Sequence, residues 1–320
     1  MAGVSQAAVS RAFTPGASVS AETRDRVLAA AQKLSYRPNL LARSLVMGRS
    51  GIIGIVMGNP KNPSCTAAIE ALSTRLAKAG KHILIFTSEK DKATADVHVE
   101  DLLKYRVDSL VLIAANISTT LADHCRASGI PVIHFNRVGK NASGITITGA
   151  NIAGARQIAE HLLRQGYRNL AYMANFRGAK TNRQREVAFT TFVTSHGLPA
   201  PQCILGHFQR DGAMAAAREL LSRRRRPDAI FCANDYMALA TMEVARFEFG
   251  IAVGRELGIA GFDDIEQASW PSFDLTTYSH PVDIMADKAL EILLQDPDAD
   301  RTMDVVVEGE LKFRGSTRRD

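Results

Sequence analysis

From Ile52 onward, short apolar runs alternate with longer amphipathic stretches. The runs with β-strand composition lie at 52–57, 82–87, 109–114, 131–135, 170–174, 229–233, 257–261 and 275–279. Helical patterns separate them, for example at 67–79, 151–165, 185–196 and 235–249. Such alternation predicts parallel, doubly wound sheets, and so many units exceed one sheet of ordinary size. We therefore predict an α/β fold with two Rossmann-like lobes.

Several classes of protein are disfavoured by what the chain lacks. No apolar run approaches the roughly 20 residues needed to cross a bilayer, and the N-terminus does not resemble an export signal. We therefore expect a cytoplasmic protein with no membrane partner. The four cysteines, at 65, 125, 203 and 232, show no metal-ligand spacing and are expected to be ordinary thiols.

The motifs of common enzyme classes are also missing. The chain contains no GxxxxGK[ST], GxSxG or HExxH sequence, and Gly51, Gly54 and Gly58 do not have GxGxxG spacing. His134 lies within an apolar run, which favours a core histidine. We predict that the protein is not an enzyme and has neither a catalytic metal nor a cofactor.

Positive charge is concentrated at the N-terminus. Residues 1–50 contain seven Lys and Arg and two Asp and Glu, so they carry +5 of the net charge of +6. This distribution is typical of a phosphate-binding module on a nearly neutral body. The alternative is a basic helical segment that has no partner.

The basic segment contains two predicted helices. Ser5 is placed to cap the first, which runs to about Phe13, and Ser20 is placed to cap the second. On a 3.6-residue period, one side of the first helix carries Gln6, Ala7, Ser10 and Arg11, and the other carries Ala8, Val9 and Ala12. The first side is suited to contacting DNA, and Arg11 can hold a guanine through two hydrogen bonds. A buried stripe of Val27, Leu28, Ala31 and Leu34 is expected on the second helix.

A short helical segment is predicted after Pro38. Leu41 and Leu45 are spaced i,i+4, with Arg43 between them. An apolar side chain such as Leu45 can enter the minor groove and unstack a base step. The alternative is a plain linker with two leucines.

These segments resemble the lactose/purine repressor family. The sequences AGVSxxxVSR, VSxETRxRV, LxYRPNxxARSL and GRSGIIGIV occur in that family's order and spacing, and the similarity continues to the C-terminus. The resemblance implies two lobes of the periplasmic-binding-protein type. It implies base contacts from Gln6, Ala7 and Arg11, phosphate contacts from Ser5 and Ser10, a minor-groove leucine at Leu45, and supporting contacts from Asn39 and Arg43.

The resemblance also implies domain boundaries. A helix-turn-helix headpiece covers 1–38, a hinge helix and linker 39–50, and an effector-binding and dimerisation core 51–320. Lobe 1 takes about 51–149 and 281–308, and lobe 2 takes about 150–280 and 309–320.

Polar residues follow several predicted strands, where ligands of doubly wound sheets bind. They are Asn136-Arg137, Asn234-Asp235 and Asp263-Asp264, and Arg185 opens a helix near the same edge. The resemblance assigns effector contacts to Arg185, Asn234 and Asp263, and places Arg137 and Trp270 at the cleft. Alternatively, Asp235 and Asp263 cap helices and the arginines form surface ion pairs.

The chain departs from the family pattern in three places. The family's first helix, with a pattern like TxxDVAxxAGVS, is expected to be absent because the sequence begins Met1-Ala2-Gly3. Either the start codon was assigned to an internal methionine, which the intact downstream sequence favours, or the headpiece is truncated. Cys65 stands where the family usually has an aromatic wall, and Ala150-Asn151 replaces a usual Asp-Asn.

The sequence therefore predicts a sequence-specific DNA-binding transcriptional regulator that acts as a repressor. Its expected partners are double-stranded operator DNA, a second copy of the chain in a homodimer or tetramer, and a small-molecule effector such as a sugar or sugar acid. The alternative is a cytoplasmic small-molecule-binding protein whose truncated headpiece does not function.

Overall fold

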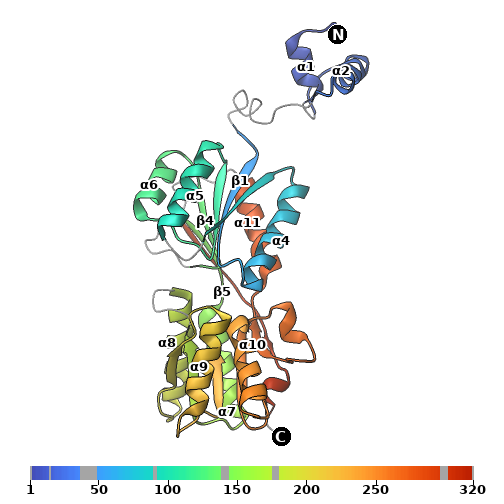
Figure 1. Cartoon of the computed structure of the whole chain (residues 1–320). Coiled ribbons are helices and arrows are strands. Elements are labelled where there is room, and N and C mark those ends of the chain that lie inside the picture. Colours follow the sequence, from blue (N-terminus) through green and yellow to red (C-terminus); the bar gives the residue numbers. More distant parts are fainter. Residues whose placement is uncertain are drawn as a thin grey trace. The chain divides into compact units, whose positions relative to one another are not determined.

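The computed structural model describes residues 2–13, 16–36, 49–88, 92–137, 144–174, 180–295 and 302–318. The chain forms two compact units, one ending at Gly51 and the other beginning at Ile52 (Figure 1). Each unit is described by itself. Among the described residues, no helix has the length and apolar character needed to span a membrane.

The N-terminal unit contains helices α1 (Gln6–Ala12) and α2 (Ala21–Lys33). The Ser5 and Ser20 hydroxyls accept hydrogen bonds from the amides of Ala8 and Thr23, both at 3.2 Å, which confirms the two predicted N-caps. Each such cap satisfies a backbone donor that the helix itself leaves unpaired.

The contact between these helices is small. Its buried apolar side chains are Ala12, Val27 and Ala31. The prediction that Leu28 and Leu34 are also buried is wrong, since they are 44% and 54% exposed. Within the described residues of this unit, α1 covers only the central part of the apolar stripe on α2, at Val27 and Ala31. Leu28 and Leu34, on either side of that part, remain exposed to solvent.

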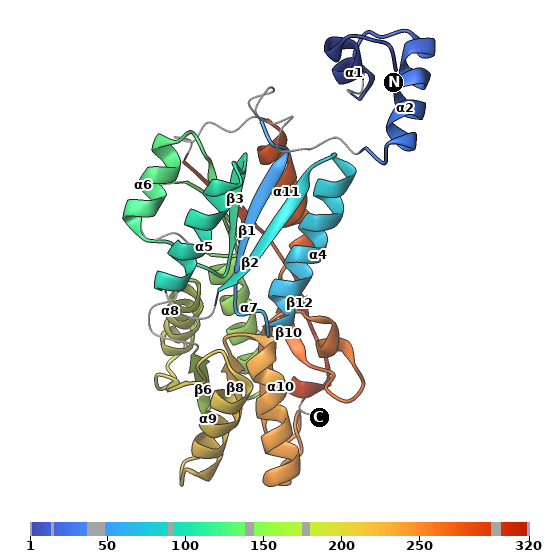
Figure 2. The same ribbon diagram turned by 45° about the horizontal axis from the view of Figure 1, so that its top comes forward.

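Lobe 1 of the second unit is built on a parallel sheet of strand order β11-β5-β4-β3-β1-β2. The strands are β1 (Ile52–Gly58), β2 (His82–Ser88), β3 (Ser109–Ile113), β4 (Val132–Phe135), β5 (Ile145–Gly149) and β11 (Met303–Val307). Helices α4 (Pro63–Lys78) and α11 (Val282–Leu294) cover one face, and α5 (Lys92–Lys104) and α6 (Thr119–Ala127) cover the other (Figure 2). Apolar side chains fill both layers between sheet and helices.

Lobe 2 repeats this plan with strand order β12-β10-β9-β8-β6-β7. The strands are β6 (Leu170–Ala174), β7 (Gln202–Leu205), β8 (Ala229–Cys232), β9 (Gly258–Asp263), β10 (Thr276–Ser279) and β12 (Leu311–Lys312). All pairings are parallel except β10 with β12. Helix α7 (Asn151–Arg164) packs beside α8 (Lys180–Ser195), and α9 (Arg210–Ser222) packs beside α10 (Asp235–Glu243).

The chain passes between the lobes after β5, after β10 and after β11. The passages are hydrogen-bonded to one another. The Gly149 amide donates to His280 Nε2 at 3.2 Å, the Ser279 amide donates to the Glu310 carbonyl at 2.8 Å, and the Glu310 amide donates to Ser279 Oγ at 2.8 Å. A change in the angle between the lobes must therefore act on three linked segments.

All eight predicted strands are confirmed to within two residues at their ends. Strands β5, β7, β11 and β12 were not predicted. β12 is only two residues long, β7 and β11 are partly exposed, and β5 is rich in Thr and Gly, so none has the continuous apolar run on which the prediction relied. The helix predicted at 235–249 ends at Glu243 and continues as a π-helical turn, Val244–Glu248.

Candidate effector site and DNA-contacting face

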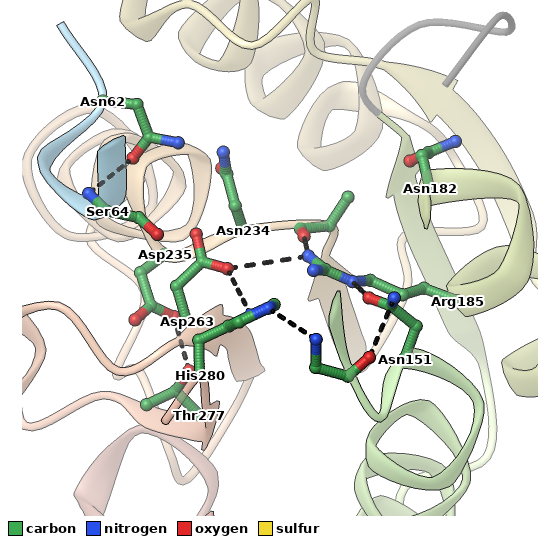
Figure 3. Close-up of polar contacts among 12 residues, drawn as sticks. Asn62, Ser64, Asn151, Asn182, Arg185, Asn234, Asp235, Asp263, Thr277 and His280 are labelled. Carbon is green, nitrogen blue, oxygen red and sulfur yellow. Dashed lines mark hydrogen bonds and ion pairs between the residues drawn. The ribbon is translucent and has the colours of Figure 1, made fainter. Parts of the chain in front are cut away.

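Arg185, Asp263 and His280 form a buried charged cluster beyond the carboxyl end of the lobe 2 sheet (Figure 3). Arg185 comes from α8, Asp263 is the last residue of β9, and His280 follows β10. Arg185 Nη1 lies 3.8 Å from Asp263 Oδ1, and the two side chains are 7% and 5% exposed. A buried ion pair of this kind needs further hydrogen bonds to offset its desolvation.

Arg185 obtains those hydrogen bonds from its neighbours. Its Nε donates to Asn151 Oδ1 at 2.8 Å, and its Nη1 donates to the Ala233 carbonyl. The guanidinium carbon also lies 3.6 Å from the ring centroid of Phe262, a cation–π contact. Burial lowers the pKa of Arg185, and the carboxylate of Asp263 opposes this effect. The guanidinium is therefore held in one orientation from several sides.

His280 links the cluster to the lobe crossings. Its Nε2 accepts from the Gly149 amide, so in the neutral ring the proton is on Nδ1, which lies 3.3 Å from Asp263 Oδ1. Burial lowers the pKa of His280 despite the nearby carboxylate, which favours this neutral form. One imidazole thus joins the crossing after β5 to the crossing after β10 and to Asp263.

Asp235 does not cap a helix, contrary to the alternative considered from the sequence. Its Oδ1 accepts from Thr277 Oγ1 at 2.6 Å, and its Oδ2 accepts from the Ile265 amide at 3.0 Å. Complete burial, with Asp263 nearby, raises the pKa of Asp235 to about 7. Asp263 is also no cap, because it ends β9 and pairs with Arg185. Asp235 instead fastens α10 to β10 and to the loop after β9.

Asn234 is the actual N-cap of α10. Its Oδ1 accepts from the Met237 amide at 2.9 Å. Its Nδ2 has no hydrogen-bond partner among the described residues, although Asn234 is only 1% exposed. A buried donor left unpaired costs about 1–3 kcal/mol. The Asn234 amide points away from the Asp263–His280 pair in Figure 3.

The first turn of α4 brings lobe 1 to the same place. Asn62 caps this helix by accepting from the Ser64 amide at 3.1 Å, and Cys65 follows. Burial raises the pKa of Cys65 to about 12, and the Asp263 carboxylate contributes to the rise. Figure 3 shows Asn62 and Ser64 of this turn in the same close-up as Asp235 and Asp263. The carboxyl ends of the two sheets therefore face each other across the crossings.

Asn136 and Arg137 follow β4 at the carboxyl end of the lobe 1 sheet. Arg137 Nη1 donates to the Ala114 carbonyl at 3.0 Å, and burial lowers the pKa of this guanidinium. Asn136 has a left-handed backbone, with φ of 57°, and its buried Oδ1 has no hydrogen-bond partner in the part of the chain that the structure describes. Both residues thus have hydrogen-bonding capacity that the described residues do not use.

Trp270 is not part of the network. It is 44% exposed and follows the 3₁₀ turn Glu266–Ser269. Its amide donates to the Gln267 carbonyl, and its own carbonyl accepts from the amides of Phe273 and Asp274. The structure therefore brings together Arg185, Asn234 and Asp263, puts Arg137 at the facing sheet end, and leaves Trp270 in its own loop.

The α1 helix presents one polar face to solvent. Gln6, Ala7, Ser10 and Arg11 are exposed, Ala8 and Val9 are half-buried, and Ala12 is buried. This is the division predicted from the helical period. Ser5, the N-cap, is also exposed, and Arg11 Nε donates to the Ala7 carbonyl at 3.3 Å. The other DNA-contacting candidates, Asn39, Arg43 and Leu45, lie outside the described residues.

Sequence reasoning missed His280 and Asn151. His280 directly follows a predicted strand, so the rule that selected Asn136, Asn234 and Asp263 selects it too. The sequence analysis considered Asn151 only because Ala150, the residue before it, replaces the Asp that is usual in the family. Its contact with Arg185 joins positions 34 residues apart and depends on the packing of α7 against α8.

Comparison with known proteins gives two family matches. Residues 1–39 match the bacterial regulatory proteins of the lacI family, and residues 159–317 match the periplasmic binding protein-like domain. The chain is 30% identical to the HTH-type transcriptional regulator GalS of Salmonella typhimurium, over 92% of this chain and 87% of that protein. It is 26% identical to the ribose operon repressor of Escherichia coli strain K12, over 92% of this chain and 90% of that protein.

Comparison with solved structures also gives a repressor that matches nearly the whole chain. A crystal structure of the lac repressor dimer bound to operator and the anti-inducer ONPF matches with a TM-score of 0.88 and 25% identity, covering 99% of this chain and 96% of that one. These relatives are regulators and not enzymes. The chain belongs to the lacI family of bacterial regulatory proteins, and it is a DNA-binding transcriptional repressor with an effector-binding domain of the periplasmic-binding-protein type.

Proposed function

We propose that the chain represses transcription as a homodimer on a near-palindromic operator, and that a small molecule bound between lobes 1 and 2 sets its DNA affinity. The observation that carries this proposal is the contact chain from Arg185 through Asp263 and His280 to Gly149. It joins the buried Arg185–Asp263 pair to two of the three lobe crossings. A ligand that engages Arg185 or Asp263 therefore acts directly on the segments that set the angle between the lobes.

The DNA-contacting surface in this proposal is the exposed face of α1. Gln6, Ala7 and Arg11 read bases, and Ser5 and Ser10 contact phosphates. In a dimer, two such helices enter successive major grooves roughly 34–36 Å apart. Asn39, Arg43 and Leu45 complete the surface from the segment after α2. The exposed polar side of α1 and the +5 charge of residues 1–50 support this assignment.

The effector surface of this proposal is formed by Arg185, Asn234 and Asp263 from lobe 2 and Arg137 from lobe 1. Trp270, which lies outside the Arg185–Asp263 network in the loop after β9, is proposed as a further contact. A hydroxyl can donate to a carboxylate and accept from a guanidinium, so this set suits a sugar, a sugar acid or a similar metabolite. Binding alters the lobe angle and thereby the segment 39–50. Coupling of this kind is typically worth about 1–3 kcal/mol and acts equally on DNA and effector affinity.

The DNA-binding part is tested by selecting binding sites from a pool of random-sequence duplexes. The expected product is a palindrome with half-sites one helical turn apart. On that site, Arg11→Ala should weaken binding by about 5- to 150-fold, because a bidentate contact to guanine contributes about 1–3 kcal/mol.

Lys33→Ala is the matched control, because it removes a cation from the last turn of α2 and leaves the α1 face intact. It should change affinity much less than Arg11→Ala and equally for specific and random DNA. Failure to enrich any site, or equal losses for the two variants, contradicts the proposal.

A further inference from the structure

Four consecutive arginines, Arg223–Arg226, lie between α9 and β8 in lobe 2. The backbone that carries them is held by neighbouring side chains. Asn169 Nδ2 donates to the Arg226 carbonyl at 2.6 Å, and Gln202 Nε2 donates to the Arg225 carbonyl at 3.1 Å. Because adjacent like charges repel one another, these hydrogen bonds hold together an arrangement that charge alone would disperse.

Three of these arginines have no acidic partner in the described part of the chain. The side chains of Arg224, Arg225 and Arg226 are exposed and form no ion pair there. Arg223 differs from them, because it pairs with Glu219. Three guanidinium groups in succession are therefore available to a partner in solution.

Arg168 adds a fourth cation from the neighbouring loop before β6. It is exposed, and its Nη1 donates to two backbone carbonyls, in and just after the last turn of α7, at 2.8 Å each. The Asp228 carboxylate close by accepts hydrogen bonds from the backbone amides of Arg168 and Asn169. We call Arg168 and Arg224–Arg226 the lobe 2 arginine patch.

Positive charge is in excess over this half of the lobe 2 sheet. The segments before β6, β7 and β8, at 160–169, 196–201 and 219–228, contain six arginines and three acidic residues. The loops before β9 and β10, at 249–257 and 264–275, contain one arginine and four acidic residues. The C-termini of α7 and α9 carry about half a negative charge each, which offsets only about one of the three surplus positive charges. Stabilising the two helix ends therefore does not account for the excess.

The side chains around the patch indicate which partner it suits. The three segments before β6, β7 and β8 are all described, and none of them contains an exposed large apolar side chain. Protein partners are bound mainly through apolar and aromatic anchors, and single-stranded nucleic acids through aromatic stacking. Guanidinium groups pair well with phosphate oxygens, and a duplex presents one phosphate about every 1.7 Å along its axis. The patch thus fits the phosphate backbone of a duplex.

We propose that the lobe 2 arginine patch is a second DNA-contacting surface, which binds a duplex without sequence preference while the headpieces hold the operator. One repressor then brings another stretch of DNA to its operator. Few phosphates are neutralised, so the affinity for a free duplex is low, but a stretch of the same DNA molecule is present at a high effective concentration. This inference goes beyond the proposed function, because it uses neither the α1 face nor the effector site.

A two-duplex capture assay with the full-length repressor tests the inference. The selected operator is fixed on beads in excess, repressor is added, and a labelled duplex of random sequence is offered at low salt. Retention of the labelled duplex should require the repressor. It should fall on the order of 40-fold between about 50 and 200 mM salt, as expected for about three neutralised phosphates.

A triple variant removes the consecutive cations and keeps the length of their side chains. Arg224→Gln, Arg225→Gln and Arg226→Gln combined should reduce retention of the labelled duplex at least tenfold. Operator affinity should stay within about twofold of the wild type, because the three exposed side chains lie outside the headpiece. This second measurement also shows that the variant is folded.

The matched control removes three exposed cations from other parts of the core. Lys104→Gln, Arg126→Gln and Arg156→Gln combined change the net charge by the same amount and leave the patch intact. This variant should retain the labelled duplex as the wild type does. Equal losses in the two triple variants would mean that net charge, and not the patch, holds the duplex, and would overturn the inference.

Other results would overturn it as well. Undiminished retention by the Arg224–Arg226 variant would show that the headpieces of a second dimer, in a tetramer, hold the labelled duplex. A wild-type repressor that retains no duplex would show that the patch does not bind DNA. Labelled polyglutamate is offered in a parallel assay, and its retention in place of the duplex would assign the patch to an acidic protein. Each of these results leaves the proposed operator binding and effector control untouched.

Discussion

Lobe 1 and lobe 2 have equivalent strand orders, apart from the antiparallel β12 of lobe 2, but satisfy their polar groups differently. In lobe 2, Arg185 is held by Asn151, Asp263 and a backbone carbonyl, and Asp235 is fully hydrogen-bonded. In lobe 1, Asn136 and Arg137 keep open capacity at the equivalent end of the sheet. The buried charges of the lobe 2 site are therefore paired or hydrogen-bonded within that lobe, although Asn234 Nδ2 has no partner among the described residues, whereas Arg137 of lobe 1 has no acidic partner among them.

This difference has a consequence for control. A preorganised lobe binds the ligand with little reordering, which lowers the cost of association. In the function proposed above, a group that has no partner gains its contact when the effector binds, so its surroundings differ between the free and bound states. Because His280 ties lobe 2 to the crossings, the two behaviours meet where the lobe angle is set.

The largest predicted effect follows from removing Asp263. Asp263→Ala leaves Arg185 buried without its counter-ion, so the free energy of unfolding should fall by about 3–5 kcal/mol. The effector response should be lost while DNA binding without effector remains. Urea unfolding measures the first effect, and operator binding with and without effector measures the second.

Asp264→Ala is the control, because the neighbouring Asp264–Arg314 pair is more exposed, at 20% and 17%. Its loss of stability should be clearly smaller. Equal losses for the two variants would show that the lobe 2 cluster is not specially dependent on its buried pair.

The second prediction concerns the pH dependence of the free energy of unfolding, to which Asp235 in lobe 2 and His134 in lobe 1 should contribute with opposite signs. In lobe 2, burial raises the pKa of Asp235 from 3.8 to about 7, so the folded state binds this proton more tightly than the unfolded chain. Its stabilising contribution is complete below pH 3.8 and is lost as the pH rises towards 7. The change is on the order of 4 kcal/mol. Asp235→Asn should remove this decline.

In lobe 1 the sign is opposite. Burial, with a contribution from Arg137, lowers the pKa of His134 from 6.5 to about 4. Its contribution to stability is complete above pH 6.5 and is lost as the pH falls towards 4, by on the order of 3 kcal/mol. Urea denaturation measures the free energy of unfolding of the wild type, Asp235→Asn and His134→Gln at each pH in this range. The difference between the wild type and each variant then gives the contribution of the replaced group. Slopes of the same sign for the two variants would contradict the assignment.

The smallest predicted effect compares two asparagines. Asn151→Ala removes the acceptor of Arg185 Nε and should cost about 1–3 kcal/mol of unfolding free energy. Asn136→Gly removes an unpartnered oxygen at a positive φ that glycine adopts freely, so its effect should stay within about 1 kcal/mol. Thermal unfolding at a fixed pH checks both. A larger loss of unfolding free energy for Asn136→Gly would mean that the Asn136 side chain makes a stabilising contact within lobe 1.

Much of the fold was predictable because it is encoded locally. Strands β1, β3 and β8 are nearly continuous apolar runs. Ser5 and Ser20 directly precede helical patterns, at the position of an N-cap. Strands β7 and β11 escaped prediction because edge strands need little apolar surface and are defined by their partners. Leu28 was wrongly expected to be buried because a helical period identifies a face and not how much of that face another helix covers.

The sequence by itself determined the class of the protein: two parallel sheets, a basic N-terminal pair of helices, and polar residues after the strands. Local periodicity, capping and charge are properties of neighbouring residues, so a sequence reveals them. Only the tertiary structure decided that Arg185 pairs with Asp263 and Asn151, that His280 joins this pair to the lobe crossings, and that Arg137 has no counter-charge among the described residues. Those facts depend on which groups far apart in the chain share a desolvated space, where a charge or donor without a partner is costly.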